Sequence, residues 1–406
     1  NGEILESFTL FTTQLGHSYG RLSDGSETWG VFTNPSRGES NQNGSLGYSS
    51  KPTLSHQAGF YDEPFLLTIS HNDFESEIRY TTNGDAPTET SQLYTEPIEI
   101  NETQVIKARL FAANPDILPG FIATKTFFIG EDHELPVVSV SGSQLLTLFN
   151  GTQNHPHGTF EYFDEAGEYI DKAVGDFNKH GNDSWNYAQR GVDFIGRDEH
   201  GYNEELNHKL FMTSDRTKFK RYMIKAAAND NYPHQTGGAH IRDAYIQHLS
   251  QLGKLRMDER TTAFCALYVN GQYWGLYDLR EKVDDHDFCD YYYNQERQYK
   301  GSEEYIQFIK TWGSSAPKYG EQRAMDDWNW LRGYVQGHFM GHPEDFAVVD
   351  ENLDWRSLVD YFMYNSYIVS RDWINYNTGW WRGLNPQGSA RAWRYILWDM
   401  DAAFGH

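Results

Sequence analysis

Polar residues near the end of the sequence have the types and the order that phosphoryl transfer requires. Asp372 is followed by Asn377, and Asp399 and Asp401 come after an aromatic, Arg-rich segment. Phosphoryl transfer needs a carboxylate that orients or deprotonates the attacking hydroxyl, and an amide and a second carboxylate that hold Mg²⁺ on the nucleotide phosphates. The residues of this segment follow that order.

The spacing of these residues is also that of a known catalytic arrangement. In protein kinases the catalytic-loop Asp precedes a metal-binding Asn by five positions, and a second metal-binding Asp lies one β-hairpin further on. Asp372 and Asn377 have this spacing, and a strand over 394–398 would deliver Asp399 at its end. Asp and Asn are also ordinary turn residues, so a purely structural role is the alternative.

A helix is predicted immediately before this segment. Asp354 is its expected N-cap, and the helix should end just before Asp372. Its expected apolar stripe consists of Leu358, Phe362 and Ile368-Val369. A longer helical stretch, rich in Tyr, Trp and Glu, is predicted over 286–340.

A hairpin and another helix precede those elements. The alternating segments 262–269 and 272–279 flank Asn270-Gly271, the strongest short-range hairpin signal, and the second strand runs into Glu281. Residues 239–252 have helical spacing of apolar side chains. Strands predicted over 206–211 and 221–228 each carry a lysine, Lys209 and Lys225.

The N-terminal part is predicted to form β-structure. Residues 1–45 contain strand fragments joined by Gly and Asp turns, too short to bury a core of their own, and 46–57 have the composition of a linker. Residues 58–132 alternate like a small immunoglobulin-like β-sandwich. The large domain is then expected over 133–406, so the chain is predicted to be multidomain.

Composition limits the partners. The formal charge of −23 repels nucleic acid backbones and anionic membranes, and no apolar run approaches the length of a membrane span. Only two cysteines are present, and the apolar pattern around Cys265 favours a buried thiol over a disulfide.

Longer motifs resemble known families. The segment 16–35 is similar to the closing strands of a lamin-tail domain, and 78–108 closely resembles the chitobiase/β-hexosaminidase C-terminal-like module. Residues 136–406 resemble the CotH-type protein kinase family, named for a spore-coat protein. The matching segments are Arg190-Gly191, Ile241-Arg242-Asp243, Val269 to Asp284, Asp372 with Asn377, and Trp398 to Gly405.

The resemblance implies an α+β, atypical protein-kinase-like domain that transfers the ATP γ-phosphate to Ser or Thr of secreted or surface proteins. It implies Asp372 as catalytic base, and Asn377 and Asp399 as ligands of Mg²⁺ or Mn²⁺. Asp401 would hold a second metal ion or support the ligands of the first. Asn375 is expected to fix the loop by hydrogen bonding rather than to bind metal.

Further residues are expected to bind the nucleotide. The hairpin strand that ends at Glu281 would present its backbone to adenine, with an ordinary edge hairpin as the alternative. A phosphate-binding lysine is required, and strand order favours Lys209 over Lys225. Arg242 would clamp phosphate or form a structural salt bridge.

The sequence also departs from the kinase pattern. A Gly-x-Gly-x-x-Gly loop is absent from it, so the segment 196–201 is expected to cover the phosphates instead. Family members usually continue with further helices beyond the position of Gly405. A C-terminal segment of the domain is therefore expected to be missing.

Alternatives of other classes remain. Asp399 and Asp401 fit the Asp-x-Asp pattern of a metal-dependent glycosyltransferase, and the accessory modules fit a catalytically inactive surface scaffold or adhesion protein. The module combination implies an extracellular or cell-surface bacterial protein, possibly part of a larger surface assembly.

Overall fold

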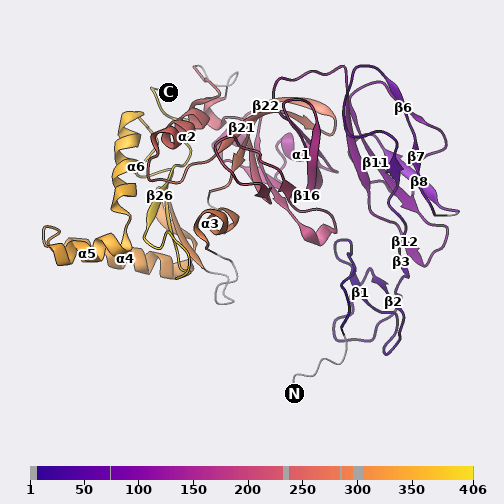
Figure 1. The fold of residues 1–406 in the computed structure, drawn as a ribbon, viewed down its shortest axis with the longest axis horizontal. Coiled ribbons are helices and arrows are strands. Elements are labelled where there is room, and N and C mark those ends of the chain that lie inside the picture. The colour runs from indigo at the N-terminus through magenta and orange to yellow at the C-terminus, as the bar shows by residue number, and fades with distance from the viewer. Residues whose placement is uncertain (1–6, 74, 232–236, 284–285, 296–304, 406) are drawn as a thin grey trace. The chain divides into compact units, whose positions relative to one another are not determined.

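The computed structural model describes residues 7–73, 75–231, 237–283, 286–295 and 305–405, with a β-rich N-terminal region and a mixed α/β remainder (Figure 1). The chain separates into two compact units. Unit 1 comprises Asn1–Lys179, Phe194–His208 and Cys265–Leu276, and unit 2 comprises His180–Asp193, Lys209–Phe264 and Tyr277–His406. Of the predicted elements, Asp284 and the 296–304 part of the 286–340 stretch lie outside the described residues.

The N-terminal fragment of unit 1 is a short hairpin. Strands β1 (Ser18–Arg21) and β2 (Trp29–Phe32) pair antiparallel. Tyr19 stacks on Trp29, with ring centroids 5.4 Å apart. The fragment is tied to the next region by backbone pairing of β3 (Gly47–Tyr48) with β12 (Ile117–Leu118). The predicted strand fragments are present, and the lamin-tail resemblance stays a prediction.

The next region of unit 1 is built on a five-stranded sheet. Its strands, in spatial order, are β5 (Gly59–Tyr61), β13 (Ala123–Ile129), β11 (Gln104–Phe111), β8 (Glu77–Thr81) and β9 (Gln92–Leu93). Two short ladders accompany it, β4 (Thr53–Leu54) with β7 (Ile69–Ser70) and β6 (Phe65–Leu67) with β10 (Ile98–Ile100). Inward residues such as Ile106 and Phe127 form the core. The β-rich region is confirmed, and its likeness to an immunoglobulin sandwich stays a prediction.

Unit 1 also contains the first strands of the predicted large domain. Strand β14 (Val137–Ser141) pairs antiparallel with β15 (His157–Phe163), which pairs with β16 (Tyr169–His180). Phe128 of the five-stranded sheet packs in one buried cluster with Phe163 and Tyr268. This packing explains why these strands group with the N-terminal region, although the family resemblance begins near them.

The predicted Asn270-Gly271 hairpin is present. Strands β21 (Thr262–Val269) and β22 (Gln272–Glu281) flank it, and both turn residues have positive φ, 51° at Asn270 and 80° at Gly271. A two-residue turn with two positive φ values matches the twist of the flanking strands, and Asn-Gly adopts it with little strain.

Unit 2 is organised around a four-stranded antiparallel sheet. The order is β24 (Ser314–Tyr319), β23 (Ile306–Trp312), β25 (Thr378–Gly383) and β26 (Arg394–Ile396). Helix α4 (Glu321–Gly337) packs on β23 and β24, and α6 (Trp355–Tyr367) packs on β26 (Figure 1). The core between helices and sheet includes Trp380, Trp393 and Tyr361.

The expected helical stretch over 286–340 is wrong in its middle part. The structure has helix α3 (His286–Tyr293), then strands β23 and β24, and then α4. Residues Ile306 to Ile309 are all buried, because β23 is an inner strand with a partner on each side. A continuous apolar segment of this length does not distinguish a buried strand from a buried helix.

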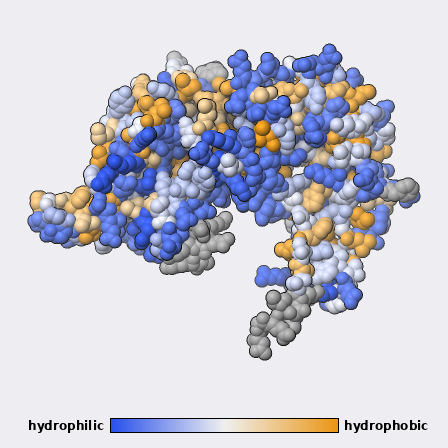
Figure 2. Space-filling model, in the orientation of Figure 1, coloured by the Kyte–Doolittle hydropathy of each residue, from blue (hydrophilic) through white to orange (hydrophobic). Residues whose placement is uncertain are grey.

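Helix α6 begins as predicted, but its apolar stripe differs. The side chain of Asp354 accepts a hydrogen bond from the backbone N–H of Ser357 at 3.2 Å. The buried face carries Tyr361 and Tyr364, whereas Phe362 is 45% exposed. Apolar groups are accordingly visible over α6 in Figure 2. Of the predicted stripe, Leu358 and Ile368 do pack in the core, whereas Phe362 and Val369 are exposed. The prediction missed the tyrosines because they were not counted as core residues.

Both cysteines, Cys265 and Cys289, are buried and neither forms a disulfide bond, as the apolar pattern around Cys265 predicts. Within the part of the chain that the structure describes, no helix has the length and apolar character to cross a membrane.

The pH dependence of stability should carry a contribution from Glu259. Burial raises the pKa of this carboxyl to about 8, against a smaller opposing effect of the hydrogen bond from Ser250. The folded protein therefore holds a proton that the unfolded chain releases, and stability should fall as pH rises from about 4.5 to about 8, by up to ~1.4 kcal/mol per unit.

Glu259→Gln should remove this decline, because the amide keeps an acceptor for Ser250 but does not titrate. The free energy of unfolding in urea, followed by tryptophan fluorescence at several pH values, should show a shallower slope for the variant. Parallel slopes for the two proteins would contradict the assignment.

Candidate functional site

A cavity of about 520 Å³ lies within unit 2 and gathers most of the predicted catalytic side chains. Its lining includes Asp372, Asn377, Asp399 and Lys225, which are far apart in sequence. Cavities of this size are typical of small-ligand sites. These four side chains come from different strands and loops, and the fold of unit 2 brings them together at the cavity.

Asp399 is positioned by a buried anchor, Asp258, that lies beside the edge strand β26. Asp258, 3% exposed, accepts hydrogen bonds from Trp381 Nε1 at 2.7 Å and Arg394 Nε at 3.0 Å. Its backbone also bonds to that of Tyr395 and Leu397, which fixes the course of the chain after β26. The chain then turns at Asp399 with φ of 52°, a conformation that Asp tolerates better than most residues.

Lys225, the last residue of β20 (Arg221–Lys225), forms a buried ion pair with two carboxylates. Its Nζ lies 2.8 Å from Asp243 Oδ2 and 2.7 Å from Asp399 Oδ1. Burial alone would lower the pKa of Lys225, but the two carboxylates outweigh it and raise that pKa above its ordinary value. The two carboxylates therefore favour the charged form of Lys225.

Asp243 connects this lysine to a second buried cation. It lies in the first turn of helix α2 (Arg242–Gly253), is 2% exposed, and also accepts from Arg280 Nη1 and Gln247 Nε2. Burial would raise the pKa of Asp243, but Arg280 and Lys225 together hold it well below its usual range. Arg280 in turn is paired with Asp278 at 2.6 Å.

Asp372 and Asn377 face each other across their loop. Asn377 donates from Nδ2 to Asp372 Oδ2 at 2.8 Å, which leaves the amide oxygen directed to accept or to bind a cation. Asn377 has φ of 48°, and Ile374 within the loop has φ of 72°. Partial burial, together with the charges of Asp399 and Asp183, raises the pKa of Asp372. Asn375 bonds through its backbone carbonyl to Gly313 N at 2.7 Å.

Arg260 supplies a second cation to the cavity wall. Its side chain is buried, and its guanidinium carbon lies 4.0 Å from the ring centre of Trp398. Among the described residues, no acceptor bonds to its Nε or Nη2. A buried guanidinium with unsatisfied donors is costly unless an anion completes it.

The loop that borders the cavity is not the predicted one. The lining comes from the 180–191 segment, including η1 (Asp183–Asn186), where Asp183 Oδ2 accepts from Asn229 Nδ2 at 3.1 Å. The expected cover, 196–201, belongs to unit 1 and is bonded to β16 through Val174. Residues 196–201 are not among those that line this cavity, and their role as a phosphate cover stays a prediction.

The preference for Lys209 is reversed. Lys209 is not among the lining residues, and its Nζ pairs with Asp215 at 2.9 Å on a side chain that is 45% exposed. It also lies beyond the short strand β18 (Leu206–Asn207), whereas Lys225 ends a buried strand. Strand order alone could not show which lysine points inward.

Arg242, Glu281 and Asp401 do not line the cavity either. Arg242 pairs with Asp230, which supports the structural alternative. The predicted adenine-facing role of Glu281 is not supported, because its backbone N–H is bonded to Thr261 O at 3.0 Å. The carboxylate of Glu281 is bonded to Arg216.

Asp401 is buried behind the cavity. Its Oδ2 accepts from the backbone N–H of Asn229 at 2.9 Å, which fixes the turn after β20. Burial, reinforced by the charge of Asp399, raises the pKa of Asp401. The two carboxylates of the Asp-x-Asp pattern therefore have different neighbours.

Sequence reasoning missed two residues of this site. Asp243 stands next to Arg242 in the quoted motif, and only the helix orientation reveals that Asp243 faces inward. Arg260 had no sequence signal, since it lies outside every motif, and its backbone N–H donates to Gln247 Oε1 of α2 at 2.9 Å.

Replacing Asp243 by Asn should destabilise unit 2 strongly. The change leaves two buried cations, Lys225 and Arg280, without their shared carboxylate, which should cost about 3–5 kcal/mol. Urea unfolding followed by tryptophan fluorescence measures this loss. Asp326→Asn, on the exposed face of α4, is the matched control and should be near neutral, and an equal effect of both changes would contradict the account.

Comparisons with known proteins place these observations in a family. No curated protein matches this chain. Residues 56–116 match the chitobiase/beta-hexosaminidase C-terminal domain, and residues 177–406 match the family described as CotH kinase protein. The second match covers more than half of the 406 residues. The chain thus has an N-terminal β-rich region followed by a kinase-like domain, and it belongs to the CotH kinase protein family.

Proposed function

We propose that this protein is an active kinase that transfers the γ-phosphate of ATP to Ser or Thr hydroxyls of secreted or cell-surface proteins. The observation that carries the proposal is the convergence of Asp372, Asn377, Asp399 and Lys225 on one cavity. A base, an amide, a carboxylate and a cation are the groups that phosphoryl transfer uses.

The charges of the cavity wall suit a nucleoside triphosphate. Lys225 and Arg260 provide fixed positive charge at the cavity wall. The Nε and Nη2 donors of Arg260 are buried without an acceptor among the described residues, and a small turn of the guanidinium would direct them to a phosphate oxygen. Lys225 reaches from a strand to a helix carboxylate, Asp243, which is the arrangement of the kinase lysine and its helix-borne acid. This ion pair holds the lysine in place while its charge remains available to the cavity.

The residues present also fit Mg²⁺. Asp399 uses Oδ1 for Lys225, and among described residues its Oδ2 has no hydrogen-bond partner. The amide oxygen of Asn377 is likewise available, because its Nδ2 donates to Asp372. These two oxygens would hold the ion, which supplies charge neutralisation on the phosphates when bound.

In the reaction that follows, Asp372 orients the acceptor hydroxyl and takes its proton. The hydroxyl oxygen forms a bond to the γ-phosphorus as the bond from that phosphorus to the β–γ bridging oxygen breaks. ADP leaves with the electron pair, and Lys225 and Arg260 offset the charge on the phosphates.

The glycosyltransferase alternative is less well supported. A single metal ion held by an Asp-x-Asp motif needs both carboxylates, but Asp401 is turned to the backbone of Asn229. An inactive scaffold would have no need for the buried charges around Lys225, which are costly to maintain. An extracellular acceptor is proposed because a chitobiase-type module accompanies the kinase domain in the same chain.

Replacing Asp399 by Asn should abolish Mg²⁺-dependent ATP binding, whereas Asp372→Asn should leave binding intact and lower turnover by about 10²–10⁴-fold. Calorimetry with Mg-ATP and transfer of labelled γ-phosphate to casein as a generic acceptor measure the two effects. Loss of binding in both variants, or turnover in Asp372→Asn equal to wild type, would contradict these roles.

Variants of Lys225 and Lys209 form a matched pair. Lys225→Met should weaken Mg-ATP binding at least tenfold, because a charge-assisted contact to phosphate is lost. Lys209→Met should bind normally, since that side chain pairs with Asp215 outside the cavity. Melting curves check that both variants are folded, and the reverse pattern would return the phosphate role to Lys209.

A further inference from the structure

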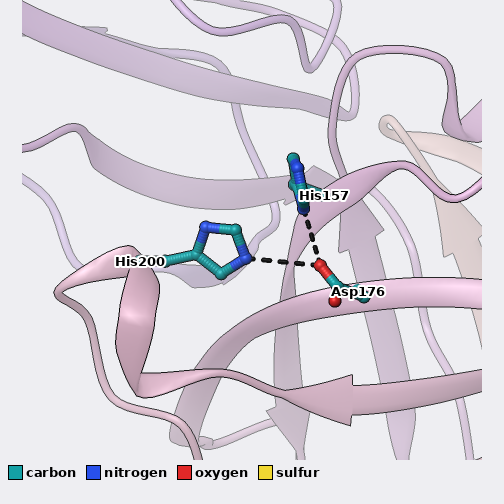
Figure 3. A group of neighbouring side chains, drawn as sticks. All are labelled: His157, Asp176 and His200. Atoms are coloured by element: carbon teal, nitrogen blue, oxygen red, sulfur yellow. Dashed lines mark hydrogen bonds and ion pairs between the residues drawn. The ribbon is translucent and has the colours of Figure 1, made fainter. Parts of the chain in front are cut away.

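Two histidines and an aspartate form a compact cluster in unit 1, and none of them lines the kinase cavity. His157, Asp176 and His200 each offer one ligand atom, and these atoms all lie within 4.8 Å of one another. Figure 3 shows both imidazole rings directed at the same carboxylate oxygen of Asp176. The distances to Asp176 Oδ1 are 2.6 Å from His157 Nδ1 and 3.3 Å from His200 Nε2.

The fold holds this cluster in place from two directions. His157 on β15 and Asp176 on β16 are direct partners across the two strands. His200 ends the short helix η2 (Asp198–His200), and Gly201 after it turns with φ of 76°. The cluster therefore joins a sheet pair to a loop.

The loop is fastened to the same strand that carries Asp176. Arg197 N donates to Val174 O at 3.0 Å, and Val174 N donates to Asn203 O at 2.7 Å. Asn203 Nδ2 also donates to Lys172 O at 2.9 Å. His200 lies between these attachments, so its ring is set against the sheet without any added ligand.

Arg197 orients the carboxylate. Its Nε donates to Asp176 Oδ2 at 2.9 Å, which leaves Oδ1 facing the two imidazoles. Such an outer contact to a ligating carboxylate is typical of metal sites. His200 is buried, whereas the side chain of His157 is 56% exposed and can move by the small distance an ion requires.

We propose that His157, Asp176 and His200 bind a divalent transition-metal ion, with Zn²⁺ as the best-fitting probe. Two imidazoles and one carboxylate are the ligand set of three-ligand zinc sites, and neighbouring ligand atoms lie about 3.3 Å apart around a tetrahedral ion. The 3.3 Å between His200 Nε2 and Asp176 Oδ1 matches that value, and the 2.6 Å between His157 Nδ1 and Asp176 Oδ1 is shorter, so the exposed ring of His157 would move outward when an ion binds.

The fourth coordination position would face a cavity. His157 and His200 both line a space of about 560 Å³ in unit 1, together with Lys107, Lys172 and Tyr202. An ion held between the rings would keep a water molecule or take an anionic ligand from this cavity, whose wall carries lysines. The exposed ring of His157 also gives the ion an entry path from solvent.

Zinc binding to the full chain, stripped of metal with a chelator, tests the proposal. Calorimetry with Zn²⁺ should show one site per chain, and Co²⁺ should give the visible absorption of a four-coordinate ion. His157→Gln or Asp176→Asn should weaken binding by more than about 100-fold, since even outer-contact changes cost about 10–100-fold. Arg197→Gln should weaken binding within that smaller range.

Two control variants distinguish Zn²⁺ binding at this cluster from Zn²⁺ binding elsewhere on the chain. His155→Gln changes a histidine of the same cavity that contacts Asn178 instead, and it should bind Zn²⁺ like wild type. Asp326→Asn, an exposed carboxylate of α4 in unit 2, should also leave Zn²⁺ binding unchanged. Absence of a stoichiometric site, equal binding by His157→Gln and wild type, or loss in Asp326→Asn alone would overturn the proposal and leave the cluster as a hydrogen-bonded group.

Discussion

The site in unit 2 depends on one buried lysine. Lys225 bonds to Asp243 on a helix and to Asp399 at the end of the sheet, and its charge is the connection between these elements. Two further charged groups, Arg280 and Asp401, also act on it. A buried cation that loses a partner is destabilising by several kcal/mol, so helix and sheet are constrained to one arrangement. The same lysine remains next to the cavity, where its charge can act on an anion.

The site combines a rigid sheet with strained residues at the cavity. The Asp258 anchor and the four-stranded sheet fix the backbone that leads to Asp399. The residues at the cavity itself, Asn377 and Asp399, have positive φ, a conformation that costs free energy for a non-glycine residue and is concentrated at functional sites. The rest of unit 2 therefore stabilises a strained backbone at the two positions where a carboxylate and an amide face the cavity.

The sequence predicted the elements whose signals are local. The Asn270-Gly271 hairpin and the Asp354 cap are present because turn and capping chemistry act within a few residues. Helix α2 is present too, but Ile241, Tyr245 and Leu252 of its predicted apolar stripe are exposed, and its buried face carries other side chains. The convergence of residues 372, 377 and 399 was expected from motif order, and the structure brings these residues to one cavity, although their catalytic roles stay predictions.

The features that the sequence did not predict depend on contacts between residues distant in sequence. Strand β23 was predicted as helix because its burial results from pairing on both sides. Lys209 could not be separated from Lys225 without knowing which strand reaches the carboxylates. Arg260 and the His157, Asp176, His200 cluster carry no motif, since each is assembled by register and loop attachment.

The most direct test of the kinase site is a crystal structure of the protein with Mg²⁺ and a non-hydrolysable ATP analogue. The account predicts phosphate oxygens within hydrogen-bonding distance of Lys225 and Arg260, and the metal ion bound by Asp399 and Asn377. A nucleotide bound elsewhere on the molecule, or a cavity that stays without nucleotide at saturating concentrations, would contradict it.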